Sequence, residues 1–359
     1  MDGTTMTSHY YDFHFEASQD LDSQLKKLDS LADVPELILC HHDKEDIPWN
    51  STIHLALTSS KARELNIEFA RRGYMVCRAP QEGTLFVHKK AVEGSWPAVN
   101  DGTYSMDTSS GLVYTLTGPR RGGDALSMVV VFSSVATNSY SQLLDRHFMQ
   151  NFPGLEKSVV DSAAVLRIAD LGGVVGSFYL PTHHDGSNSS KVAEFIARIA
   201  GDLGIKRTAV LLYGASKGGT GALYHALTGG FSCVSVDPFV SNDHRNTPGT
   251  DPYYINTEIF TASLEATLSS SVEVLKSQTF DSEWRPMISL VSSPGSAEYP
   301  SIQHFVNAYA SQYINFVVVN HPLIRRHKDV AGRTVPLVLG LMNLELLGIR
   351  PSIGSRFDV

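Results

Sequence analysis

One six-residue segment limits the fold of this chain more than any other. Residues 214–219 read Gly-Ala-Ser-Lys-Gly-Gly and follow an apolar run at 208–213 (TAVLLY) that favours a strand. Gly214 and Gly218 stand two residues before and two after Ser216, where larger side chains would collide in a tight turn. Because a helix-like pattern begins near Lys217, the segment predicts a sharp strand-to-helix turn that projects the Ser216 hydroxyl out of a sheet.

The same segment indicates a nucleophilic serine. A helix amino terminus behind Ser216 favours negative charge, as a tetrahedral intermediate of acyl transfer requires. Gly219 and Gly221 follow in the predicted helix, and each costs about 1 kcal/mol of helix propensity, so we expect close packing there. The alternative is a glycine-rich turn that only packs a helix onto a sheet.

A nucleophilic serine needs a base, and the base needs a carboxylate that orients it. In this kind of turn architecture the chain order is Ser, then Asp or Glu, then His. Glu298 is the preferred acid because it lies in the turn after the strand expected at 287–292. Asp237, at the end of the strand expected at 231–236, is the alternative acid.

The base should follow the last strong strand, which we expect at 314–319. His327 lies eight residues beyond that strand, on a loop that can return over the serine, and it is the preferred base. His321, two residues beyond the strand, is the alternative.

The remaining site predictions concern the oxyanion and the substrate. The backbone N–H of Lys217, the residue after the nucleophile, is the expected first donor of an oxyanion hole, and Ser134 lies on the loop expected to supply the second. Tyr254, on an aromatic loop, His184 and Arg326 are candidate substrate contacts. The arginine could receive an anionic acyl donor.

Strand and helix patterns alternate from residue 125 onward, which predicts an α/β fold with a mostly parallel sheet and helices on both faces. The span 238–286 is longer than a crossover needs and is expected to be an insertion that forms a lid or pocket wall. Strands are expected at 126–135, 163–169, 208–213, 231–236, 287–292 and 314–319, and helices at 191–203, 217–227, 262–276, 302–309 and 335–347.

Residues 1–124 form a separate amino-terminal accessory module in this interpretation, α+β or β-rich, and residues 125–359 form the catalytic domain. Residues 1–33 are polar and indicate a frayed arm or a short helix, and residues 61–72 have helical spacing. Short strands are expected at 36–40, 53–57, 84–88 and 111–117.

Composition excludes several classes of protein. The 359 residues suit about two domains, and 42% hydrophobic with 18% charged residues suits a globular core. The net charge of −8 argues against general nucleic-acid binding. Neither a signal peptide nor a run of residues apolar enough to span a bilayer is visible, so we expect a cytoplasmic protein with no membrane span.

No cofactor and no metal are expected. The three cysteines, Cys40, Cys77 and Cys233, include no CxxC pair and so encode neither a disulfide framework nor a thiolate zinc site. The clusters at 41–43 and 183–185, both His-His-Asp, lack metalloprotease spacing and are interpreted as ordinary surface residues.

The stretch 211–227 (LLYGASKGGTGALYHAL) resembles the elbow of the α/β-hydrolase superfamily. Its S-K-G-G-x-G-A form is similar to that of bacterial capsular polysaccharide biosynthesis proteins and of accessory secretion proteins that act on adhesin glycans. The resemblance covers about residues 126–347. It implies an esterase-type fold and sugar O-acetylation chemistry, with a Ser-Glu-His triad on Ser216, Glu298 and His327.

We therefore expect a serine hydrolase that cleaves an ester or thioester through an acyl-enzyme on Ser216. An acyltransferase that passes the acyl group to a sugar or natural-product alcohol or amine is the first alternative. A non-catalytic scaffold of this fold in a biosynthetic or secretion complex is the second. The expected partner is a small-molecule or carrier-bound acyl substrate, and homo-oligomer formation is left open.

Overall fold

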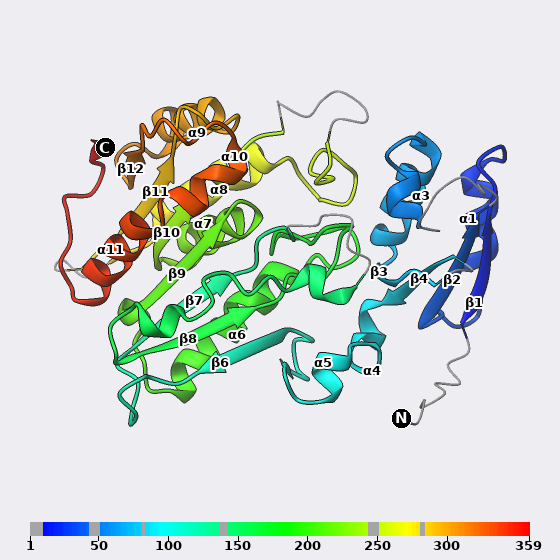
Figure 1. The fold of residues 1–359 in the computed structure, drawn as a ribbon, viewed down its shortest axis with the longest axis horizontal. Helices are drawn as coiled ribbons and strands as arrows, with labels where there is room; N and C mark the ends of the chain where they lie inside the picture. Colours follow the sequence, from blue (N-terminus) through cyan, green and yellow to red (C-terminus); the bar gives the residue numbers. More distant parts are fainter. Residues whose placement is uncertain (1–9, 43–50, 81–82, 137–142, 243–250, 281–283) are drawn as a thin grey trace.

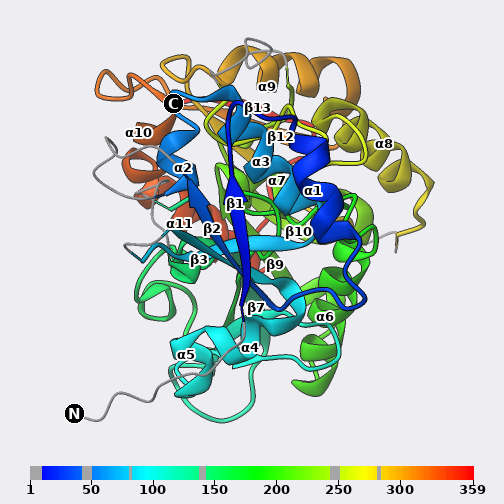
Figure 2. The ribbon, with the colours of Figure 1, turned by 90° about the vertical axis from the view of Figure 1, so that its right-hand side faces the viewer.

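The computed structural model describes residues 10–42, 51–80, 83–136, 143–242, 251–280 and 284–359. Its elements form two sheets, a four-stranded one near the amino terminus and a nine-stranded one in the rest of the chain (Figure 1). Figure 2 views the molecule from the side on which the smaller, amino-terminal sheet lies.

The larger sheet has the order β13-β12-β11-β10-β9-β7-β8-β6-β5. Neighbouring strands pair in parallel from β13 to β8 in this order, and only the pairs made by β5 and β6 are antiparallel. The predicted fold class, α/β with a mostly parallel sheet, is therefore confirmed. Along the chain the strands are β5 (Ser105–Met106), β6 (Val113–Thr117), β7 (Ser127–Phe132), β8 (Ala163–Ile168), β9 (Val210–Ala215), β10 (Ser232–Val236), β11 (Ile288–Ser292), β12 (Ile314–Val318) and β13 (Arg356–Asp358).

Helices cover both faces of this sheet, which explains why its central strands are continuous buried runs. Alternate residues of β7 face opposite layers: Met128 and Val130 join the core under one set of helices, and Val129 and Val131 the core under the other. The first set is α6 (Asn188–Asp202), α7 (Lys217–Gly229), α8 (Leu264–Ser277) and α9 (Tyr299–Phe305) with the π-helical turn Val306–Ala310, and the second is α10 (His327–Arg333) and α11 (Val335–Leu346).

The smaller sheet has the order β1-β2-β4-β3. Strand β1 pairs with β2 in parallel, and the other two pairs are antiparallel. Its elements are β1 (Tyr11–Phe15), α1 (Leu21–Asp29), β2 (Leu37–His42), α2 (Thr52–Leu55), α3 (Ser60–Arg71), β3 (Tyr74–Arg78) and β4 (Thr84–His88), and the short helices α4 (Val92–Ser95) and α5 (Pro97–Asn100) lead toward the larger sheet.

Three expectations for the amino-terminal region are corrected. Residues 53–57, expected as a strand, lie largely in α2, where the Thr52 hydroxyl is 2.8 Å from the buried Asn66 amide oxygen. The described part of the expected arm contains β1 as well as a helix. Strands β5 and β6 precede residue 124 and still pair into the larger sheet. The predicted module boundary at residue 124 therefore lies after the first two strands of that sheet along the chain.

The four-stranded sheet and its helices, from β1 to α5, form an amino-terminal unit. This unit packs directly against loops of the larger unit, which is the nine-stranded sheet with its helices. One apolar cluster joins Phe69 and Phe86 of the amino-terminal unit with Phe178, Phe239 and further residues of the larger unit. An ion pair between Lys89 Nζ and Asp185 Oδ2, 2.8 Å apart, links the same two units. The amino-terminal unit is therefore attached through both apolar and charged contacts.

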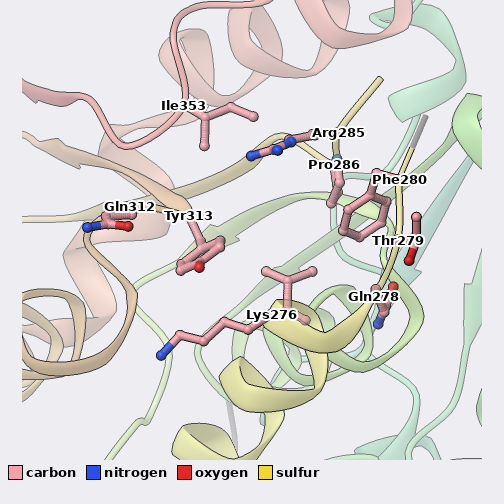
Figure 3. A pocket seen from close by; sticks show the side chains of 10 residues that line it. Lys276, Gln278, Thr279, Phe280, Arg285, Pro286, Gln312, Tyr313 and Ile353 are labelled. Carbon is pink, nitrogen blue, oxygen red and sulfur yellow. The ribbon is translucent and has the colours of Figure 1, made fainter. Parts of the chain in front are cut away.

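A cavity of about 360 Å³ lies beside the amino-terminal ends of β11 and β12 (Figure 3). Its wall includes Phe280, Arg285 and Tyr313. Since Ser216 follows the carboxyl end of β9 in the same parallel sheet, this cavity is at the opposite end of the sheet from the elbow. Among the described residues, no helix combines the length and apolarity needed to cross a bilayer.

Candidate active site

Ser216 occupies the junction between β9 and α7. Its backbone has φ 56° and ψ −123°, a conformation that residues other than glycine rarely adopt. The Ser216 N–H donates to the Val236 carbonyl oxygen at 2.8 Å, which anchors the turn to the neighbouring strand β10. The strained serine turn that the spacing predicts is therefore present.

The glycines of the segment are required by close backbone contacts. A Cβ on Gly214 would lie 2.0 Å from the Gly218 carbonyl oxygen, and a Cβ on Gly218 would lie 2.3 Å from the Phe132 carbonyl oxygen. A Cβ on Gly221 would lie 2.5 Å from the Tyr179 ring. These distances are below any van der Waals contact, so the glycines let α7 begin tightly against β7 and its neighbours.

His327 connects Ser216 to a carboxylate. Its Nε2 is 2.8 Å from Ser216 Oγ, and its Nδ1 is 2.8 Å from Asp237 Oδ2. The side chain is 17% exposed at the first residue of α10, and the Phe239 ring lies against it with a centroid separation of 4.8 Å. The imidazole is thus positioned between hydroxyl and carboxylate, with one face covered by an aromatic ring.

The carboxylate at His327 is Asp237, the alternative acid, and not Glu298, the preferred one. Asp237 follows β10 with φ 46°, and its N–H donates to the Val291 carbonyl oxygen at 2.7 Å, which turns its side chain across the end of β11. Glu298 is buried at the start of α9, where its N–H donates to Ser296 Oγ at 3.2 Å. The structure therefore brings together Ser216, His327 and Asp237.

Two serines that the sequence analysis did not single out hold the Asp237 carboxylate. Ser292 Oγ donates to Asp237 Oδ1 and Ser296 Oγ donates to Asp237 Oδ2, each at 2.5 Å. Both come from the end of β11 and the turn after it, the place where Glu298 was expected to act. The run Ser292-Ser293-Pro294-Gly295-Ser296 was the available signal, because hydroxyls clustered at the end of a buried strand need a polar partner.

The alternative base and one candidate substrate contact lie away from this chain of hydrogen bonds. His321 is exposed, and its Nδ1 accepts a hydrogen bond from the Leu323 N–H at 3.1 Å. Arg326, next to His327, points its Nε at Asp329 Oδ1 at 3.2 Å, with a side chain 64% exposed.

The other two candidate substrate contacts lie at the boundary with the amino-terminal unit. Tyr254 is buried, and the Arg63 guanidinium of α3 lies 4.0 Å from its ring centroid. His184 packs edge-on against His88, with ring centroids 5.3 Å apart, and its ring fills the space that a side chain on Gly73 would need. Both residues therefore have a role in joining the two units.

The expected oxyanion donors lie at the start of α7 and in the loop after β7. Lys217 begins α7, and its N–H is at the helix amino terminus directly after Ser216. Ser134 follows β7, and its Oγ donates to Asn151 Oδ1 at 2.9 Å. The side chain of Lys217 is fully buried and extends to Asp170, a contact that the sequence analysis did not foresee.

No group of three potential metal ligands occurs within the part of the chain that the structure describes. His41 stacks on His14 with ring centroids 4.8 Å apart, and its Nε2 is 2.9 Å from Asp12 Oδ1. Asp43 of the first His-His-Asp cluster lies outside the described residues. In the second cluster, Asp185 binds two lysines, which hold the pKa of its carboxyl far below the ordinary value despite partial burial.

The solved structures to which this chain is similar include hydrolases and an acetyltransferase. Serine hydrolase F of Staphylococcus aureus, a fluorophosphonate-binding enzyme solved with substrate, has a TM-score of 0.47 at 12% identity, over 67% of this chain and 96% of that one. An S-formylglutathione hydrolase from Agrobacterium tumefaciens has a TM-score of 0.47 at 13% identity, over 69% and 94%. The capsule O-acetyltransferase of Neisseria meningitidis serogroup A has a TM-score of 0.45 at 14% identity, over 67% and 93%.

No protein-family model and no curated protein sequence matches this chain. The α/β-hydrolase-like architecture is nevertheless visible in the chain itself, in its mostly parallel nine-stranded sheet and in the serine turn between β9 and α7.

Proposed function

We propose that this protein is a serine-dependent acyl enzyme that hydrolyses an ester or thioester of a small-molecule or carrier-bound substrate. Ser216 is the nucleophile, His327 the general base and Asp237 the carboxylate that orients the imidazole. The single observation that supports this most is the continuous chain Ser216 Oγ, His327 Nε2, His327 Nδ1 and Asp237 Oδ2, with 2.8 Å at each hydrogen bond.

The proposed first half-reaction forms the acyl-enzyme. Ser216 Oγ attacks the carbonyl carbon while its proton passes to His327 Nε2, and the resulting imidazolium is stabilised by Asp237. The tetrahedral intermediate collapses, the bond to the leaving group breaks, and that group departs with the proton from His327. In the second half-reaction His327 takes a proton from water, the hydroxyl attacks the acyl-serine, and the acid product leaves as Ser216 regains its proton.

The field around Ser216 supports negative charge on the carbonyl oxygen. The first N–H groups of a helix have no acceptor within the helix and are directed toward its amino terminus, where Ser216 lies. The 13-residue helix α7 adds the positive end of its dipole at the same place. We propose the Lys217 N–H as one oxyanion donor and the backbone beside Ser134 as the second.

Acyl transfer to an alcohol or amine is the second candidate. It is favoured by the aromatic side chains beside the base: Phe239 lies against His327, and the Tyr253 ring lies 5.1 Å from Phe239. An apolar wall next to the acyl-serine lowers the local concentration of water and gives another acceptor an advantage. The two candidates share the acyl-enzyme and differ only in what releases the acyl group.

A fluorophosphonate probe tests the proposal. We expect covalent labelling of the wild-type protein on Ser216, loss of labelling in S216A, and a decrease of at least a hundredfold in H327A, because the serine then lacks its base. H321A should label at the wild-type rate, since His321 is exposed and bonded to Leu323. A folded wild-type protein that resists the probe would support the scaffold alternative and contradict the enzyme proposal.

A further inference from the structure

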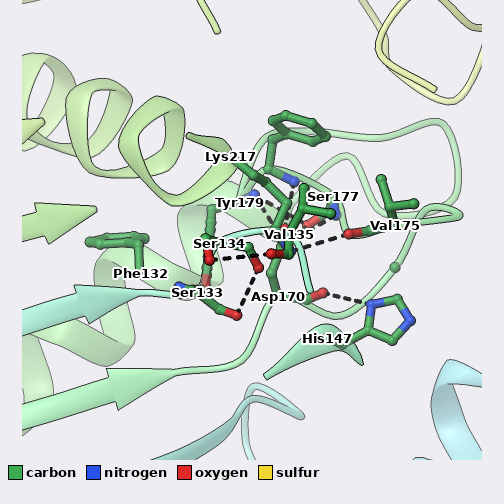
Figure 4. Close-up of polar contacts among 12 residues, drawn as sticks. Phe132, Ser133, Ser134, Val135, His147, Asp170, Val175, Ser177, Tyr179 and Lys217 are labelled. Carbon is green, nitrogen blue, oxygen red and sulfur yellow. Dashed lines mark hydrogen bonds and ion pairs between the residues drawn. The ribbon is translucent and has the colours of Figure 1, made fainter. Parts of the chain in front are cut away.

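The side chain of Lys217 is a buried cation that the proposed acyl chemistry does not use. It is fully excluded from solvent, and its Nζ lies 2.9 Å from Asp170 Oδ2 (Figure 4). The same nitrogen donates to the Val175 carbonyl oxygen at 3.2 Å. A Cβ on Gly176 would lie 2.5 Å from Nζ, so the backbone at this glycine closes over the ion pair.

Asp170 gathers a strained segment around this pair. Its carboxylate accepts the Ser177 N–H at 3.0 Å, the Ser177 hydroxyl at 2.6 Å, the Phe178 N–H at 2.9 Å and the Tyr179 N–H at 3.2 Å. Phe178 and Tyr179 have φ values of 57° and 60°, a left-handed conformation that costs on the order of 1 kcal/mol or more for each such residue. The hydrogen bonds to one carboxylate offset that cost.

Tyr179 extends the network to the loop after β7. Its hydroxyl accepts the Ser133 N–H at 2.6 Å and donates to the Ile168 carbonyl oxygen at 2.7 Å. The Ser133 N–H is therefore already hydrogen-bonded to the Tyr179 hydroxyl, and this bond fixes the direction of the backbone that continues to Ser134. The ring of Tyr179 also fills the space beside Gly221 in α7.

We propose that Lys217 and Asp170 form a positioning pair that sets the two oxyanion donors of Ser216 relative to each other. The inference rests on the proposed function and adds a role for a side chain in it. Lys217 carries one donor on its own backbone, and its side chain is tied through Asp170 and Tyr179 to Ser133, beside the second donor. The two side chains are excluded from solvent and act on the substrate only through the backbone that they position.

The burial of this pair argues for a positioning role. Removing two charges from water carries a large desolvation cost, and a well-packed apolar pair of the same size is often equally stable or more stable. A fully buried Lys217 directly after the nucleophile is therefore a costly way to add stability. It is an effective way to fix a backbone N–H, because the ammonium has defined partners on two sides.

The test compares K217M with the wild type on p-nitrophenyl acetate and on phenylboronic acid, which forms a tetrahedral adduct with a nucleophilic serine. Methionine keeps an unbranched side chain, one heavy atom shorter than that of lysine, and removes the charge, while Asp170 keeps its four hydrogen bonds from residues 177–179. Since losing one oxyanion donor outright costs about a hundred- to a thousandfold, we expect misplacement to lower kcat by about ten- to a hundredfold. KM should stay within about threefold, and phenylboronic acid should bind weaker by the same factor as kcat/KM.

A matched control removes a buried charge at the other end of the sheet. Glu345 is 6% exposed and is bonded to Ser232 and Arg350. E345Q should lower the melting temperature and leave kcat and boronate affinity unchanged. A folded K217M with wild-type kcat and boronate affinity would overturn the proposal, and so would a change confined to KM.

A second variant covers the case in which K217M does not fold. Y179F removes only the hydroxyl between the Ser133 N–H and Ile168, and we expect kcat to fall by about three- to tenfold with the boronate affinity, because the Ser133 N–H loses its acceptor. Wild-type kinetics in Y179F would contradict the proposal. If the wild-type protein itself neither turns over the ester nor labels on Ser216, the proposed function fails, a result distinct from an active wild type with insensitive variants.

Discussion

Replacing each of the two candidate carboxylates, Asp237 and Glu298, by its amide in separate variants shows which of them orients His327. D237N retains the size of the side chain and replaces the oxygen 2.8 Å from His327 Nδ1 with an amide. An amide N–H2 that faces Nδ1 selects the imidazole tautomer whose proton is on Nε2, and that tautomer cannot accept the Ser216 proton. In the Ser-His-Asp template the same exchange lowers kcat by about 10⁴-fold, which corresponds to about 5 kcal/mol of transition-state stabilisation.

We expect most of this loss of kcat in D237N of the present protein. Asp237 is 2% exposed, so water cannot replace its charge, and two serine hydroxyls hold its other acceptor sites. We expect ester hydrolysis by D237N to fall at least a thousandfold with little change in KM. E298Q is the matched control and should stay within about threefold, because Glu298 does not lie at His327 Nδ1. Loss of activity in E298Q with retention in D237N would refute this reasoning and restore the acid that the sequence analysis preferred.

Two further predictions concern packing and pH. G218A should lower the free energy of unfolding by about 1–3 kcal/mol, because its Cβ would meet a carbonyl oxygen of β7's last residue at 2.3 Å, whereas G94A, with no neighbour within 4 Å, should unfold like the wild type in urea. Acid should also destabilise the protein. Burial lowers the pKa of His88 and of His225 to about 4 and that of His147 well below its ordinary value, so the unfolded chain binds more protons below about pH 6.5. The stabilisation is complete above pH 6.5 and declines toward pH 4, by up to about 1.4 kcal/mol per pH unit for the fully buried His225 and by less for the partly exposed His88. Equal urea midpoints at pH 7.5 and pH 5 would contradict this, as would a G218A midpoint equal to that of G94A.

The serine turn could be predicted from the sequence because its determinants are local. A tight turn with the serine at φ 56° needs small residues at fixed offsets, and Gly214 and Gly218 occupy those offsets. The parallel sheet was predictable for a similar reason: its central strands are apolar on both faces, a pattern that few other structures produce.

The choice of acid was not predictable in the same way. Asp237 reaches His327 because its backbone adopts φ 46° after β10, and Ser292 and Ser296 occupy the turn where an acid after β11 would have to act. Both facts depend on how neighbouring strands end in three dimensions. A single sequence shows only that each carboxylate follows a strand.

The amino-terminal unit shows the limit of short patterns. Residues 53–57 are an apolar run of strand-like composition, but a run this short fits a helix equally well. Thr52 donates hydrogen bonds to Thr84 and Asn66 and accepts one from the Asn66 amide, and these bonds favour the helix. The Lys217–Asp170 pair was equally hidden, because it joins residues 47 positions apart along the chain whose burial only the folded loops create.

The most direct test of the account is whether Ser216 becomes acylated. The protein is mixed with p-nitrophenyl acetate, nitrophenolate release is followed in the first turnover, and the acid-quenched protein is digested and mapped by mass spectrometry. We predict that the acetyl group appears on the peptide that contains Ser216, and that S216A shows neither the adduct nor the release. Turnover by the wild type that persists in S216A, or an acetyl group found only on another residue, would contradict the assignment of Ser216 as the nucleophile.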